Sequence, residues 1–296
     1  MGMDEFQAVL KARELVRKVN PTAIPLPVEL YAKEVGAVIR PQADMGPDEA
    51  GSCFEMNGKR FICTNANDRP ERQRFTVCHE IAHLWLGLPS QHESLLWWSY
   101  AKRPLAEILC DVFAAELLLP YNLFQPEVER ASIGLSSIDD LAERFQASVT
   151  ATGSRYAAVV SEPVAFVLSE QGKVRYASRS KPLKDAPAWI PPRLDIPEGS
   201  LAKKVRAGTS FESRDAVDAD VWFNDWERGG TLLEEARHLP QWDQTLSLLW
   251  FENGEVPGRK FRDERGAVYA EEENEDDALL KELDGQLRWP GKRRRR

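Results

Sequence analysis

Three polar residues stand at a spacing that could hold a metal ion and use it. His79, Glu80 and His83 follow the pattern His-Glu-x-x-His within residues 72–87. On a helix, residues four apart lie on one face, so both imidazoles can reach one metal ion while Glu80 projects beside them toward metal-bound water. This arrangement is typical of zinc peptidases. The alternative interpretation is a chance placement of two surface histidines.

A zinc site that does chemistry needs a third protein ligand and one open position for water. His92 does not fit, because Leu86 and Pro89 stand where the longer motif that ends in a third histidine has glycine and histidine. Two other candidates, Glu107 and Asp111, lie downstream in a second apolar segment.

That second segment, residues 104–120, has the pattern of a helix, with Pro104 suited to its first turn and Pro120 to its end. Glu107 and Asp111 stand four apart and share a face with apolar residues. A carboxylate that faces a packing surface is costly unless it is paired or bound to metal, which favours Glu107 as the third ligand. Asp111 can accept a hydrogen bond from the other nitrogen of a ligating imidazole. The alternative is that both carboxylates lie on a solvated face.

These residues carry a resemblance to a known family. The run RQRFTVCHEIAHLWLG, followed by AEILCDVFAAELLLP, resembles the ImmA/IrrE family of metallopeptidases. Members of that family carry an R-x-R-F-x-x-x-H-E-x-x-H helix and then E-x-x-x-[ND]-x-F-A-x-x-L-L-x-P. The likeness is strong over roughly the first 125 residues and looser beyond them. It implies a zinc ion (Zn2+) held by His79, His83 and Glu107, with Glu80 as the general base.

Two departures from the family pattern are cysteines. Cys78 and Cys110 stand where small apolar residues are expected, and neither replaces a catalytic group. The four cysteines show no C-x-x-C spacing, so a structural zinc knuckle is not expected.

Composition limits the functional classes. The chain has 296 residues, 43% hydrophobic and 29% charged, which fits a globular protein with a sizeable core. We expect a cytoplasmic protein with no membrane segment, because no apolar run approaches the length of a span and the first residues mix acidic and basic side chains. The net charge of -8 argues against broad nucleic-acid affinity.

The predicted fold class is α+β, and its first part is a zincin-like peptidase domain over residues 1–127, with a small sheet beside the active-site helix. Its expected helices and strands are 4–20, 28–35, 37–40, 51–56, 60–64, 72–87 and 104–120. We predict that the strand ending at Asn65 lies beside the active helix and that a substrate backbone pairs with its free edge, so that Cys63, Thr64 and Asn65 contact substrate. The alternative is a strand of the core sheet.

The chemistry also needs a donor for the oxyanion that forms during hydrolysis. Tyr100, Tyr121 and His92 are candidates, and a structural role is the competing interpretation for each.

A helix-turn-helix-like segment is predicted over residues 128–160. Ser137 is expected to cap the first helix, and the second covers residues 149–160. That second helix offers little for DNA beyond Arg155, and acidic residues surround the pair. We therefore favour a packing or protein-docking role and do not expect direct DNA binding.

The remaining chain is predicted as a smaller α+β domain over residues 161–256, for which the family resemblance implies a sensor role, and a charged, partly disordered tail over 257–296. The expected elements are a hairpin at 164–168 and 173–177, a loop at 181–200, a strand at 220–223, a helix at 231–239 and a strand at 244–251. The tail has an acidic block at 271–277 and a basic block at 292–296.

The sequence thus predicts an intracellular zinc-dependent endopeptidase. By resemblance, its substrate would be a helix-turn-helix repressor whose cleavage derepresses stress or mobile-element genes. One alternative is a non-proteolytic regulator that binds a partner or DNA through residues 131–160. Another is a hydrolase that acts on something other than protein, which the His-Glu-x-x-His pattern alone does not exclude.

Overall fold

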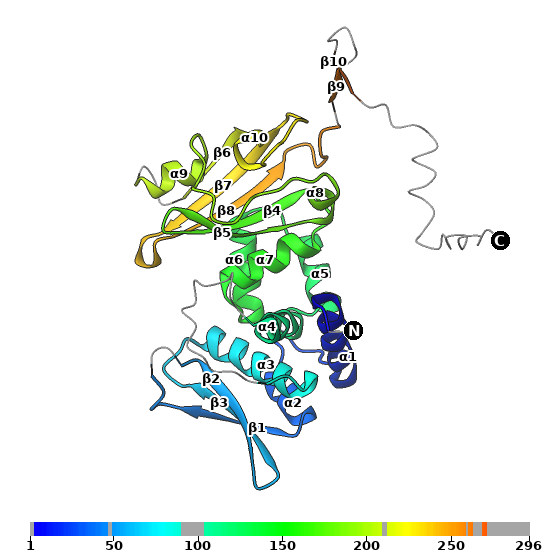
Figure 1. The fold of residues 1–296 in the computed structure, drawn as a ribbon, viewed down its shortest axis with the longest axis vertical. Helices are drawn as coiled ribbons and strands as arrows, with labels where there is room; N and C mark the ends of the chain where they lie inside the picture. The colour runs from blue at the N-terminus through cyan, green and yellow to red at the C-terminus, as the bar shows by residue number, and fades with distance from the viewer. Residues whose placement is uncertain are drawn as a thin grey trace, which may run out of the picture.

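The computed structural model describes residues 3–46, 49–89, 104–208, 212–258, 260–262 and 268–270. The fold is mixed α+β, as predicted, and its elements form layers (Figure 1). A three-stranded sheet lies at one end, followed by helices α1 to α4, then helices α5 to α7, a five-stranded sheet and the short helices α8 to α10. Within the described ranges, every helix is too short or too polar to cross a lipid bilayer.

The small sheet has the strand order β1-β3-β2, formed by β1 (Ala37–Gln42), β3 (Lys59–Asn65) and β2 (Gly51–Met56). Strand β1 pairs with β3 in parallel, and β2 pairs with it antiparallel. Asn57 and Gly58 join β2 to β3 with φ angles of 52° and 72°. Both angles are positive, as a two-residue Asn-Gly hairpin turn requires.

The prediction that the strand ending at Asn65 has a free edge is wrong. Strand β3 is central, and its neighbours take the hydrogen-bonding groups of both its edges. Cys63, Thr64 and Asn65 are at most 3% exposed. The Asn65 side-chain amide donates to the carbonyl oxygens of Gly46 (2.9 Å) and Glu49 (3.0 Å), so it holds the loop that leads into β2.

Helices α2 (Val28–Glu34) and α3 (Pro70–Leu86) pack on this sheet, and α1 (Glu5–Val19) and α4 (Leu105–Leu118) pack against these two helices. All four confirm predicted helices. Helix α3 has a proline at its first position and ends at Gly87, whose φ of 66° is the left-handed conformation that favours glycine. Helix α4 packs against both α3 and α1.

Three further helices form the next layer: α5 (Tyr121–Arg130), α6 (Leu135–Phe145) and α7 (Val149–Val159). The sequence did not predict α5, because Pro126 lies inside it and a proline there removes a helix hydrogen bond. The pair α6 and α7 confirms the expected helices, but Ser137 is not the cap. Helix α6 begins at Leu135, whose backbone N–H donates to the carboxylate of the distant Glu235 at 3.2 Å.

The five-stranded sheet is antiparallel with the order β5-β4-β8-β7-β6. Its strands are β4 (Val164–Glu170), β5 (Lys173–Arg179), β6 (Glu212–Asp218), β7 (Thr231–Leu239) and β8 (Gln244–Phe251). The hairpin β4–β5 and strand β8 were predicted.

Two predictions in this part are wrong. Residues 231–239 form strand β7 rather than a helix, and the predicted strand at 220–223 is largely helix α10 (Ala219–Trp222). Strand β7 contains good helix formers, but it hydrogen-bonds on both sides to β6 and β8, and this pairing overrides local propensity.

Short elements complete the described chain: α8 (Lys181–Asp185), α9 (Leu201–Arg206), a 3-10 turn (Pro240–Trp242), β9 (Lys260–Arg262) and β10 (Val268–Ala270). Helix α8 lies within the predicted loop at 181–200. The charged blocks at 271–277 and 292–296 lie outside the described residues.

One hydrophobic core runs from α1 through α7 to the facing side of the five-stranded sheet. Phe166 and Leu248 of the sheet share this core with Cys78 and Cys110 of α3 and α4. A second core covers the other side of the sheet beneath α8 to α10. The proposed boundaries after residues 127 and 160 therefore cross a continuous core, and division into separately folding domains stays a prediction.

Candidate metal centre

Helix α3 places His79 and His83 one turn apart with their rings together. The two Nε2 atoms lie 3.1 Å apart, and the ring centroids are 4.9 Å apart. His83 is buried and His79 is nearly so. The helical spacing that the sequence predicted thus brings both imidazoles to one point.

Helix α4 adds a carboxylate to this point. Glu107 Oε2 lies 3.1 Å from His79 Nε2, and Glu107 Oε1 lies 3.5 Å from His83 Nε2. One potential ligand atom from each of the three residues lies within 4.8 Å of the others. The cluster therefore holds the three residues that the sequence nominated as ligands.

Hydrogen bonds at the far side of each ring set which nitrogen faces the cluster. Asp111 Oδ1 lies 2.9 Å from His79 Nδ1, and the carbonyl oxygen of Leu88 lies 3.4 Å from His83 Nδ1. Both partners are acceptors here, so each Nδ1 carries the proton and each Nε2 presents a lone pair inward. The Leu88 contact is made by backbone, so the sequence held no side-chain signal for it.

Two imidazole lone pairs and a carboxylate that converge in a buried space repel one another unless a cation or proton lies between them. Two histidines and one acidic residue are a known set of protein ligands for catalytic zinc. The donor set, its orientation by Asp111 and its burial therefore fit a zinc ion.

Without metal, a proton takes the place of the cation. Burial lowers the pKa of His79, but hydrogen bonds with Asp111 and Glu107 and the nearby negative charges outweigh burial and raise that pKa to about 9. The pKa of His83 is lowered, first by burial and then by the charge of His79. At neutral pH the metal-free cluster thus holds one proton more than the two on the Nδ1 atoms, and this additional proton is on His79.

This raised pKa predicts that zinc binding at neutral pH releases about one proton, because the metal needs the neutral imidazole. Below a pH of about 9, apparent zinc affinity should fall about tenfold for each unit by which the pH is lowered. Calorimetry in two buffers of different ionisation enthalpy counts the released proton. A zinc affinity that is unchanged between about pH 7 and pH 9 would contradict the assigned protonation.

Glu80 lies beside the histidines and is 3% exposed. Its charge acts on both imidazoles. Among the described residues, Glu80 Oε2 has no hydrogen-bond partner. A buried acceptor without a donor is costly to a fold, so this oxygen is suited to accept a proton or hydrogen bond from water or substrate.

Other predicted site residues are not in this cluster. Tyr121 begins α5, beyond the end of α4 opposite to Glu107, and its ring packs under the Arg13 guanidinium at 5.0 Å. It is therefore not the oxyanion donor. Tyr100 and His92 lie outside the described residues.

The two cysteines near the ligands are buried thiols. Burial raises the pKa of Cys78 to about 12. Burial also raises the pKa of Cys110, and the charges of Glu107 and Asp111 add to that shift. Both groups are protonated at neutral pH and pack in the core, which disfavours reactivity at either sulfur.

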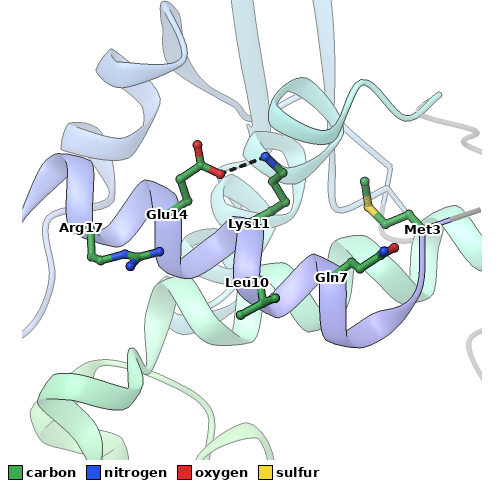
Figure 2. Close-up of a pocket in the computed structure, with 6 residues that line it drawn as sticks. All are labelled: Met3, Gln7, Leu10, Lys11, Glu14 and Arg17. Carbon is green, nitrogen blue, oxygen red and sulfur yellow. Dashed lines mark hydrogen bonds and ion pairs between the residues drawn. The ribbon is translucent and has the colours of Figure 1, made fainter. Parts of the chain in front are cut away.

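A surface hollow elsewhere does not compete with this site. Figure 2 shows it along α1, lined by described residues that include Leu10, Lys11 and Glu14. Lys11 and Glu14 form an exposed ion pair at 2.9 Å. None of the ligand candidates lines it.

The part of the chain that contains the cluster matches a known protein family. The model of the IrrE N-terminal-like domain matches residues 32–156, which include all three ligand candidates and Glu80. Residues 32–156, which we call the IrrE domain, are similar to this family model. The resemblance to the ImmA/IrrE family is thereby confirmed for this part of the chain.

Two curated relatives of the chain are radiation response metalloproteases. The chain is 34% identical over 109 residues to IrrE of Deinococcus radiodurans, which is 36% of this chain and 33% of that protein. It is 39% identical over 101 residues to IrrE of Deinococcus deserti, which is 32% of this chain and 34% of that protein. The matches thus span about a third of the length of each relative.

The likeness in fold extends beyond the IrrE domain. A solved structure of a Mycobacterium tuberculosis transcriptional regulator superposes with a TM-score of 0.59, covering 83% of this chain and 76% of that one. The sequences are 13% identical, so this match shows a shared fold alone.

Proposed function

We propose that the chain is a zinc-dependent endopeptidase with His79, His83 and Glu107 as metal ligands. The observation that carries this proposal is the largely buried cluster of these three residues beside a carboxylate oxygen, Glu80 Oε2, that has no partner among the described residues. The similarity of the IrrE domain to two metalloproteases supports it.

Each side chain has a role in hydrolysis. Zinc supplies Lewis acidity, which lowers the pKa of a water ligand and polarises a substrate carbonyl. Glu80 takes the proton from the attacking water and passes it to the leaving amine, which a carboxylate within hydrogen-bond reach can do. Asp111 holds the proton on His79 Nδ1 and so keeps the Nε2 lone pair directed inward.

The free edge of β2 is the better place for an extended substrate. Strand β2 is an edge strand and packs against α3. Gly51 permits a close approach, since a Cβ at that position would lie 2.4 Å from Cγ2 of Thr76, one turn before Glu80. A peptide that pairs with this edge through its backbone would be bound with little dependence on sequence.

The substrate class follows from the family resemblance. We propose that the protein acts inside the cell on a helix-turn-helix repressor, whose cleavage derepresses stress genes. The printed names of the Deinococcus relatives, radiation response metalloproteases, agree with a stress role.

The packing of α7 disfavours the alternative of a DNA-binding regulator. Helix α7 contacts α5, α6, β4 and β5. Arg155, its one basic side chain, donates to Glu116 and to the carbonyl oxygen of Leu119. A Cβ at Gly153 would lie 2.4 Å from the Phe166 ring. Because α7 is covered on several sides, insertion into a DNA groove would require its release from the core.

Comparison of protein termini in cells tests the proposed function. Cells that express the parent chain should contain a new amino terminus within a repressor protein, and cells that express Glu80→Gln should not. The Glu80→Gln variant is the matched control, because it retains the fold and the metal ligands. Identical sets of termini in both cultures, with both proteins zinc-loaded, would refute the endopeptidase proposal.

A further inference from the structure

Helix α4 is held from two opposite sides. Glu107 and Asp111 near its beginning face α3 and the histidines. Glu116 follows Glu107 by nine residues, which places it about 13 Å along the axis and on the opposite face. The positions of Glu107 and Asp111 therefore depend on contacts at both faces of α4.

The contacts of Glu116 come from three other parts of the chain. Its Oε1 accepts hydrogen bonds from Arg13 Nε of α1 at 3.2 Å and from the Tyr121 backbone N–H at 3.1 Å. Its Oε2 accepts one from Arg155 Nη2 of α7 at 2.5 Å. The Glu116 side chain is 1% exposed. A carboxylate buried this deeply is costly unless all these donors pair with it. The Glu116 side chain therefore fixes α4 relative to α1 and α7.

Arg155 extends this connection to the larger sheet. Its Nε donates to the Leu119 carbonyl oxygen at 3.1 Å, just past the end of α4. The same helix α7 packs on β4 and β5, where the Tyr176 hydroxyl donates to the Thr150 carbonyl oxygen at 3.3 Å. One helix thus joins the five-stranded sheet to α4.

We propose that Glu116 and Arg155 are positioning residues, which hold α4 so that Glu107 and Asp111 lie at the histidines. This inference rests on the proposed metal site. Under this proposal α7, the second helix of the helix-turn-helix-like pair, holds α4 in place. It also makes the geometry of the metal site depend on the placement of the five-stranded sheet.

The test measures zinc affinity of the full-length chain by competition with a chromophoric chelator, in protein shown to be folded by circular dichroism. Glu116→Gln and Arg155→Lys should each weaken zinc binding about tenfold, because both would displace Asp111, and loss of the hydrogen-bond partner of a metal ligand costs about 10- to 100-fold in affinity. The zinc affinity of the double variant should equal that of the single variant with the lower affinity, because both changes break the same connection.

Glu127→Gln is the matched control. Glu127 pairs with Arg130 and Arg144, which are in α5 and α6 and not in α4. This control should bind zinc as the parent does. A purely structural role of Glu116 would lower the melting temperature without changing zinc affinity.

Parent-like zinc affinity in folded Glu116→Gln would overturn the inference while leaving the metal site intact. If Glu116→Gln does not fold, Arg155→Lys decides by the same criterion. A parent chain that binds no zinc, or binds it equally after His79→Ala, would instead refute the metal site and the inference with it.

Discussion

Glu80→Gln is expected to keep zinc bound and to lose peptide cleavage. Glutamine has nearly the same shape but cannot accept the proton of the attacking water. General acid–base catalysis contributes about 10²- to 10⁴-fold to rate, so kcat should fall by at least about 100-fold. The proposed ligands at residues 79, 83 and 107 are unchanged, so zinc content measured by mass spectrometry should equal that of the parent.

Glu71→Gln is the matched control for this prediction. Glu71 lies in the first turn of the same helix, outside the cluster. It should leave both kcat and zinc content unchanged. Parent-like cleavage by Glu80→Gln would remove Glu80 from the mechanism, and loss of zinc would place it among the ligands.

Glu107→Ala is expected to lose the metal. The remaining imidazoles would form an incomplete zinc site, and the negative charge that offsets the cation would be gone. Substitution of a residue that hydrogen-bonds to a metal ligand costs about 10- to 100-fold in metal affinity, so loss of a ligand itself should cost more than about 100-fold. Chelator competition measures the dissociation constant.

Glu143→Ala provides the control for this second prediction, because Glu143 is an exposed glutamate of α6. It should bind zinc as tightly as the parent chain does. If Glu107→Ala also binds zinc at parent strength, Glu107 is not a ligand and the third position belongs to another group.

The cluster of His79, His83 and Glu107 was predictable because the sequence patterns that indicate it lie within two short segments. Helical spacing alone places His79 and His83 on one face, and an apolar neighbourhood marks Glu107 as a carboxylate that needs a partner. The convergence of α3 and α4 was inferred from that need, and the structure brings the three residues together.

The edge of the small sheet was not predictable in the same way. Strand order depends on which strands pair with β3, and no pattern within β3 shows whether it has one neighbour or two. The predicted free edge at Cys63, Thr64 and Asn65 was wrong for this reason. Their burial is equally consistent with a central strand, which was the competing interpretation.

The errors in helices share a second cause, which is contact between residues far apart in sequence. Residues 231–239 are a strand because two neighbours pair with them. Helix α6 begins before Ser137 because Glu235, a hundred residues later, accepts the hydrogen bond of Leu135. Asp139, an acidic residue of α6, likewise accepts hydrogen bonds from the distant Arg237 at 2.7 and 2.9 Å.

Anomalous diffraction from zinc-loaded crystals, measured at X-ray energies above and below the zinc absorption edge, tests the central claim most directly. We predict one anomalous peak about 2.0 to 2.2 Å from His79 Nε2, His83 Nε2 and a Glu107 carboxylate oxygen. A peak bound by other residues, or zinc bound with Glu107 turned away from both imidazoles, would contradict the account.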